Sequence, residues 1–123
     1  MKNLSLTLAF VIVVLSGCKK DEEPDPFCGF GTISSCINQK IQAIKSEPVT
    51  TPATKIFSYQ YRGQTVYYIP AQCCDFPSEL YDENCNLICY PDGGFSGNGD
   101  GLCNDFYDKA TNKTLIWEDP RPN

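Results

Sequence analysis

The sequence predicts an α+β fold in which one N-terminal helix packs on a small antiparallel sheet, stapled by disulfides and carrying an irregular Gly-rich loop. Three observations predict this class. Apolar residues recur with helical spacing between positions 33 and 44, and apolar and polar residues alternate on both sides of Arg62-Gly63. The chain also has 8 cysteines in 123 residues, which is typical of a small exported domain held by disulfides.

The first 17 residues are expected to be a lipoprotein signal peptide. The apolar stretch from Leu4 to Leu15 is too short to span a bilayer, which needs about 20 residues. It ends in Leu15-Ser16-Gly17-Cys18, which resembles the bacterial lipobox, so Cys18 is the predicted lipidation (palmitate) site and membrane anchor. The alternatives are an ordinary signal peptide and an N-terminal membrane helix.

Residues 18–27 are predicted to be a lipid anchor followed by a disordered tether, because the segment is rich in charge and proline. Lys19-Lys20 followed by Asp21-Glu22-Glu23 resembles the surface-export signal of Bacteroidetes lipoproteins. A plain solvated linker is the alternative. We therefore expect an outer-membrane lipoprotein at the cell surface, or else on the periplasmic face, with residues 28–119 forming a single small Cys-rich domain.

The predicted helix has four isoleucines on one stripe, Ile33, Ile37, Ile41 and Ile44. Thr32 or Ser34 is expected to cap its start. The Glu47-Pro48 step is expected to end it, because a residue before proline avoids helical angles.

Two hairpins are expected to follow the helix. The first joins residues 54–61 to residues 64–70 through Arg62-Gly63, and the second joins Glu79 to Cys89 through residues 82–84. Residues 91–101, here called the glycine loop, are predicted to be irregular. Asn112 is expected to form a turn between the last two apolar runs, residues 106–107 and 115–117.

Seven cysteines remain after Cys18, so at most three bridges form and one thiol is left over. The disulfide candidates are Cys28, Cys36, Cys73, Cys74, Cys89 and Cys103. A Cys89–Cys103 bridge would close the glycine loop, and a Cys28–Cys36 bridge would staple the helix start. Cys73 and Cys74 are adjacent and are expected to bond to different partners. A zinc site built from Cys73, Cys74, Cys89 and Cys103 is the disfavoured alternative, because no paired C-x-x-C occurs.

Charge and composition exclude several functions. Without Lys2 of the signal the chain has 9 Lys and Arg against 15 Asp and Glu, a net charge of −6, so we expect no nucleic-acid partner. The absence of histidine removes Ser-His-Asp and Cys-His catalysis and histidine metal sites. We expect no enzyme activity, no cofactor and no metal.

Two features allow ligand binding. Asp92, Asn98, Asp100 and Asp105 supply oxygen ligands among glycines, which suits calcium, although no EF-hand register fits and a long turn is the alternative. The 7 Tyr, 7 Phe and 1 Trp would suit a carbohydrate-stacking face, or else form the core.

Five segments form a recognisable pattern: residues 66–70, Cys73-Cys74-Asp75, residues 80–82, Ile88-Cys89 and the stretch from Asp92 to Phe106. Together they resemble a family of uncharacterised Bacteroidetes lipoprotein domains. The resemblance spans about residues 33–118 and implies one domain at the outer membrane, with no known activity and no catalytic or binding residue. Cys85 departs from the pattern, since a glycine would suit the turn better, and it is therefore the predicted free thiol.

Together these observations predict a non-enzymatic lipoprotein of unknown role. The expected partners are the membrane, through the lipid anchor, and an unknown protein or glycan ligand. The alternatives are a protease inhibitor that presents residues 91–101 and a structural component of the envelope.

Overall fold

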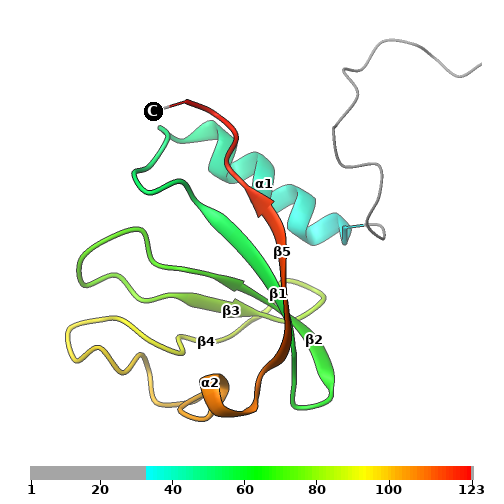
Figure 1. Ribbon diagram of the computed structural model, residues 1–123, viewed down its shortest axis with the longest axis vertical. Helices are drawn as coiled ribbons and strands as arrows, with labels where there is room; N and C mark the ends of the chain where they lie inside the picture. Colours follow the sequence, from blue (N-terminus) through cyan, green and yellow to red (C-terminus); the bar gives the residue numbers. More distant parts are fainter. Residues whose placement is uncertain (1–32, 123) are drawn as a thin grey trace, which may run out of the picture.

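The computed structural model describes residues 33–122, and the predicted signal peptide, Cys18, the tether and Cys28 lie outside this range. The elements are α1 (Ser35–Ser46), β1 (Lys55–Tyr61), β2 (Gln64–Ile69), β3 (Glu79–Tyr81), β4 (Leu87–Cys89), α2 (Phe106–Lys109) and β5 (Thr111–Glu118) (Figure 1). The strands form one antiparallel sheet in the order β4-β3-β2-β1-β5, and α1 packs on one of its faces. The predicted α+β class is confirmed. No helix of the described range is long and apolar enough to cross a membrane.

Helix α1 begins and ends where its sequence signals predict. The Ser34 hydroxyl accepts a hydrogen bond from the Ile37 amide at 3.4 Å, and Glu47 is the extended residue at the C-terminal end. Ile37 and Ile41 are buried on the sheet, against Ile56 of β1. The isoleucine stripe is therefore the face that attaches the helix to the sheet.

The β1–β2 hairpin has the predicted turn, with both turn residues at positive φ, Arg62 at 49° and Gly63 at 79°. This turn matches the twist of the strands that it joins. Because side chains alternate along a strand, the sheet has two packed faces. Ile56 and Tyr67 lie on the α1 face, and Tyr61 and Val66 belong to a second core on the opposite side.

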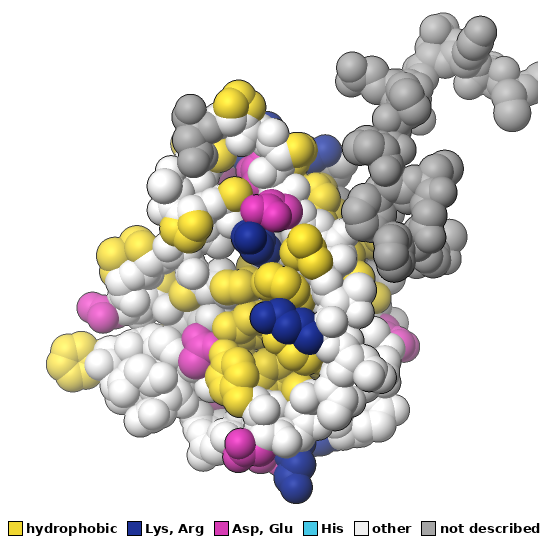
Figure 2. Space-filling view, viewed as in Figure 1, with side chains coloured by type: hydrophobic (Ala, Val, Ile, Leu, Met, Phe, Trp, Pro, Cys, Tyr) yellow, Lys and Arg dark blue, Asp and Glu magenta, His cyan; other side chains and the backbone are white. Residues whose placement is uncertain are grey.

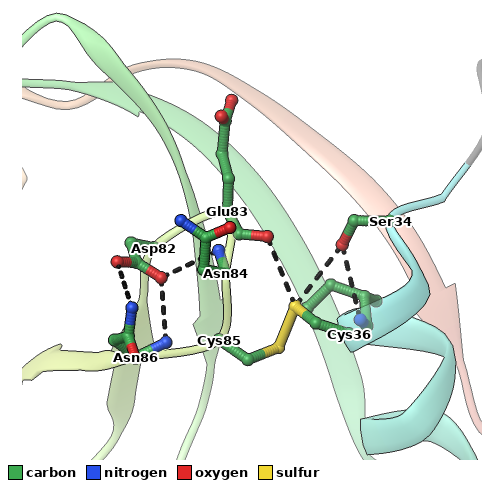
Figure 3. The surroundings of a disulfide bond; sticks show 8 residues. Ser34, Cys36, Asp82, Glu83, Asn84, Cys85 and Asn86 are labelled. Atoms are coloured by element: carbon green, nitrogen blue, oxygen red, sulfur yellow. Dashed lines mark hydrogen bonds between the residues drawn. A yellow bond between two sulfur atoms is a disulfide. The ribbon is translucent and has the colours of Figure 1, made fainter.

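A disulfide between Cys36 and Cys85 joins the first turn of α1 to the β3–β4 turn (Figure 3). The prediction that Cys85 is the free thiol is therefore wrong, and so is a Cys28–Cys36 bridge. Cys85 does take the positive φ, 61°, that glycine would favour. Asp82 shapes the turn by accepting hydrogen bonds from the amides of Asn84 and Asn86. The turn places the Cys85 side chain at the helix, a contact between segments 49 residues apart.

Asn112 lies within β5 and does not form a separate turn, which corrects the prediction. Its φ is 55°, and the pairing of β1 with β5 shifts register between Ser58 and Gln60. A second shift leaves Ile116 without a direct β1 partner, so that Ile116 and Trp117 both pack toward α1. These irregularities have the character of β-bulges, which keep an asparagine of positive φ inside a strand.

Arg121 holds the end of the chain on α1. Its guanidinium donates hydrogen bonds to the backbone carbonyls of Ile44, Lys45 and Glu47 and to both carboxylate oxygens of Asp119. These carbonyls belong to the last turn of the helix and the residue after it, where the amide four residues ahead is no longer available and positive charge is favourable. The Ile44 carbonyl also accepts a hydrogen bond from the Glu47 amide, at 3.1 Å.

Replacing Arg121 is expected to flatten the acid dependence of stability. The Arg121 guanidinium lowers the pKa of Asp119, so this carboxylate stabilises the fold above about pH 4, and its contribution is lost as the pH falls through the lowered folded-state pKa. In Arg121→Gln the free energy of unfolding should decline less steeply below about pH 4. Urea unfolding measured from neutral to acid pH checks this, with the exposed Lys109→Gln as control. An unchanged slope in Arg121→Gln would contradict it.

Candidate binding site at the glycine loop

The glycine loop is closed by a disulfide between Cys89 and Cys103, as predicted. Both cysteines are buried in the second core, Cys89 at the end of β4 and Cys103 just before α2. The loop is therefore anchored at both ends in the second core.

Hydrogen bonds within the loop hold its backbone in one conformation. The Asp100 carboxylate accepts from the amides of Tyr90 and Leu102, at 3.0 and 2.9 Å, and the Asp100 amide donates to the Tyr90 carbonyl. The Gly93 amide donates to the Gly97 carbonyl, and the Gly99 amide donates to the Gly93 carbonyl. Many backbone amide and carbonyl groups of the loop thus find their hydrogen-bond partners within the loop or at its ends.

Gly99 is required where the loop folds back on its start. Its φ is 63°, and an added Cβ would lie 1.8 Å from the Tyr90 carbonyl oxygen. Gly97 also has a positive φ, 75°, but a Cβ there would meet nothing within 4 Å. A side chain at position 99 would therefore be disfavoured both by the positive φ and by a steric clash, whereas at position 97 only the positive φ would disfavour it.

Gly99→Ala is expected to destabilise the protein more than Gly97→Ala. Positive φ costs an alanine about 1 kcal/mol at either site, and displacement of backbone atoms should raise the total at Gly99 to about 2–4 kcal/mol. Chemical denaturation of both variants measures the difference. Equal losses would mean that the loop relaxes freely around position 99.

Phe95 lies at the tip of the loop, with its side chain 100% exposed. It follows Gly94 in a tight turn closed by a hydrogen bond from the Gly97 amide to the Gly94 carbonyl, at 3.1 Å. Phe95 is not among the residues predicted above. It is the only aromatic residue between positions 91 and 101, and that isolation among glycines and polar residues is the signal that identifies it.

A concavity of about 650 Å³ lies beside the loop. The residues that line it are Pro91, Asp92, Gly97, Asn98, Gly99, Asp100, Gly101, Asn104 and Tyr107. Most of its side chains are polar, and Tyr107, which is 57% exposed, supplies an aromatic wall. This combination suits a polar ligand with one flat apolar face.

Asp92 fixes the aromatic wall. Its carboxylate accepts hydrogen bonds from the hydroxyls of Tyr68, at 2.8 Å, and Tyr107. Burial raises the pKa of Tyr68 well above its usual value, and the neighbouring Asp92 carboxylate adds to the shift. The ring of Tyr107 also meets the rings of Tyr68 and Phe106 edge-on. Tyr68 therefore stays a protonated donor at ordinary pH. The hydrogen bond to Asp92 and the two ring contacts hold the Tyr107 ring in place.

The four predicted calcium ligands do not come together. Asp92, Asn98 and Asp100 line the concavity, but Asp105 accepts hydrogen bonds from the Tyr61 hydroxyl, at 2.6 Å, and from Arg62, at 2.8 Å. The hydrogen bond from Tyr61, assisted by Arg62, lowers the pKa of Asp105. Among residues 33–122 no three Cys, Asp or Glu side chains are grouped to hold a metal. The carboxylates of Asp92 and Asp100 instead hold the loop and its wall.

The zinc alternative is wrong, because Cys89 and Cys103 are bonded to each other. Cys73 and Cys74 are both exposed, and neither is bonded to another cysteine of the described range.

Most of the aromatic residues between positions 33 and 122 belong to the two cores. Tyr61, Tyr68 and Phe106 are buried, and the Lys113 ammonium lies 4.4 Å from the centre of the Phe57 ring. Figure 2 shows apolar side chains gathered in the middle of the face turned to the viewer, with basic side chains beside and over them. Within the glycine-loop site, Phe95 and Tyr107 are the exposed rings.

Residues 42–119 match the model of one protein family, a domain of unknown function (DUF6970). No curated protein and no solved structure matches the chain.

Proposed function

Because the chain belongs to the DUF6970 family, which has no assigned activity, we propose its function from the geometry of the glycine loop. The protein is a non-enzymatic lipoprotein of the bacterial outer membrane, displayed at the cell surface, that binds a protein partner with this loop. The observation that carries the proposal is the complete exposure of Phe95 at the tip of a disulfide-closed loop.

A fixed loop that presents one aromatic ring is suited to protein recognition. Aromatic anchors that fill a pocket of the partner carry much of the binding energy in protein interfaces. A loop already ordered by a disulfide and its own hydrogen bonds loses little further conformational entropy on binding. Inhibition of a protease is one form that this binding would take, with Phe95 entering the specificity pocket.

The proposed location at the cell surface is supported by the amino-terminal sequence and by the disulfides. Residues 15–18 resemble a lipobox, and the charged residues after Cys18 resemble a Bacteroidetes surface-export signal. Two disulfides within the described range agree with folding in an oxidising compartment. The carboxylates of Asp92 and Asp100 accept hydrogen bonds from the Tyr68 hydroxyl and the Tyr90 amide. Because these carboxylates are engaged in maintaining the loop, they support a binding role over a catalytic one.

A glycan is the second candidate ligand, favoured by the concavity beside the loop. Tyr107 supplies a ring on which a sugar face can stack, and the exposed Asn98 and Asn104 supply amide groups for its hydroxyls. This ligand would occupy the concavity and leave Phe95 free.

Binding by the full chain and its Phe95→Ala variant tests the proposal. The bound molecule is identified by cross-linking to surface proteins and by panels of proteases and glycans. For a protein partner, Phe95→Ala should weaken binding by about 30-fold or more, because truncating a central anchor costs at least about 2 kcal/mol.

Leu102→Ala is the matched control, because Leu102 is 65% exposed and lies in the same disulfide-closed segment, away from its tip and next to Cys103. Its binding should match that of the unmodified chain. Binding that survives Phe95→Ala but is lost in Asn104→Ala would replace the protein partner with a glycan. Binding unaffected by either change would remove the glycine loop as the site.

A further inference from the structure

Cys73 and Cys74 place two sulfur atoms side by side on the surface. They lie between β2 and β3 in a turn closed by a hydrogen bond from the Phe76 amide to the Cys73 carbonyl, at 3.4 Å. The Cys74 Sγ lies 2.6 Å from the Cys73 Sγ, and both residues are exposed. Adjacent cysteines in an extended chain would point to opposite sides, so this arrangement needs a special backbone.

The backbone conformation of Cys74 allows the two sulfur atoms to lie on the same side. Its φ is 63°, a left-handed conformation that is uncommon for any residue other than glycine, asparagine or aspartate. This conformation turns the Cys74 side chain to the side of Cys73. The premise that the two side chains point to opposite sides does not hold, because the segment is a turn and not a strand. Bonding of the two cysteines to different partners stays a prediction, since neither is bonded to another cysteine of the described range.

We propose that Cys73 and Cys74 form an oxidation site that closes into a vicinal disulfide when it meets a low-molecular-weight disulfide such as oxidised glutathione. The thiolate of one cysteine attacks a sulfur of the reagent, forms a mixed disulfide and releases one thiol. The neighbouring thiolate then attacks the protein sulfur of that mixed disulfide and expels the second thiol. The protein loses two protons and two electrons, and the reagent is reduced to two thiols.

Position and access set this site apart from the two disulfides of the described range, because Cys36 and Cys85 are half-buried and Cys89 and Cys103 are buried. Cys89 and Cys103 are 1% and 2% exposed, so solution reagents reach them poorly, whereas Cys73 and Cys74 are exposed. Adjacent Cα atoms are about 3.8 Å apart, closer than the usual disulfide range of about 4.4–6.8 Å. The vicinal ring should therefore be reduced before the Cys89–Cys103 bridge, whose Cα atoms lie 6.1 Å apart.

Peptide mapping of the full chain tests the proposal. The chain is equilibrated with oxidised glutathione, alkylated, denatured in acid and cleaved by chymotrypsin after Tyr68 and Tyr81. Residues 69–81 contain Cys73 and Cys74 and no other cysteine. This peptide should carry no alkyl group and be lighter than the dithiol by two hydrogen atoms. After mild reduction it should gain two alkyl groups while the Cys36–Cys85 and Cys89–Cys103 peptides stay cross-linked.

Cys73→Ser and Cys74→Ser are the matched controls. Each leaves one thiol that cannot close the ring, so a stable glutathione adduct should accumulate on it, while intact Cys36–Cys85 and Cys89–Cys103 bridges show that the variant is folded. The proposal would be overturned if peptide 69–81 of the unmodified chain kept two free thiols or a glutathione adduct. A bridge from Cys73 or Cys74 to Cys28 would overturn it equally.

Discussion

Replacing Cys36 and Cys85 together by alanine is expected to lower the free energy of unfolding by about 4 kcal/mol. The bridge joins residues separated by 49 positions, and a cross-link that closes a long loop removes more entropy from the unfolded chain than one that closes a short loop. It also attaches α1 to the β3–β4 turn, so its loss frees the helix start from the far edge of the sheet.

Denaturant unfolding of the full chain measures this effect. The control is the double replacement of Cys73 and Cys74 by alanine, which removes two exposed cysteines and no bridge within the described residues. It should change stability by no more than about 0.5 kcal/mol, as expected for surface sites. A Cys36/Cys85 variant that unfolds at the same denaturant concentration as the unmodified chain would contradict the expected role of this bridge.

Phe106→Ala is expected to cost about 3–5 kcal/mol, the range for removing a buried aromatic ring. Phe106 is 0% exposed and meets the rings of Tyr59, Tyr61, Tyr68 and Tyr107 at centroid distances of 5.1–5.6 Å. Its removal leaves a cavity in the second core, which contains Cys89 and Cys103, and ends one of the contacts that position Tyr107. The loss should therefore reach the binding site as well as the core.

Denaturant unfolding and near-ultraviolet circular dichroism follow this change together. Leu102→Ala is the control, because Leu102 is a large apolar residue that is 65% exposed, and it should cost no more than about 0.5 kcal/mol. If Phe106→Ala cost no more than Leu102→Ala, the second core would not be the well-packed cluster that its ring contacts indicate.

The helix and both hairpins are predictable because their signals are local. The isoleucine stripe and Ser34 define α1 with no reference to the sheet. Arg62-Gly63 and the alternation around it define the β1–β2 hairpin, and Asp82 marks the next turn. Cys89 and Cys103 flank a flexible loop, so their pairing is also visible in the sequence.

The errors concern contacts between segments far apart in the chain, or a single residue's φ. Cys85 suits a turn that favours glycine, and only the packing of α1 shows that its sulfur meets Cys36. Asn112 has a turn-like φ, but pairing with β1 keeps it in a strand. The sequence predicts Asp105 to lie with the loop residues, but its carboxylate accepts a hydrogen bond from the Tyr61 hydroxyl of β1.

Periodicity, capping and turn residues therefore determine the class of the fold, because each depends on residues within a few positions of one another. The pairing of Cys36 with Cys85, the separation of Asp105 from the loop and the proximity of the Cys73 and Cys74 sulfurs depend on how the elements pack and on individual φ values. No short sequence window contains that information, since a side chain's partner is set by the three-dimensional path of the whole domain.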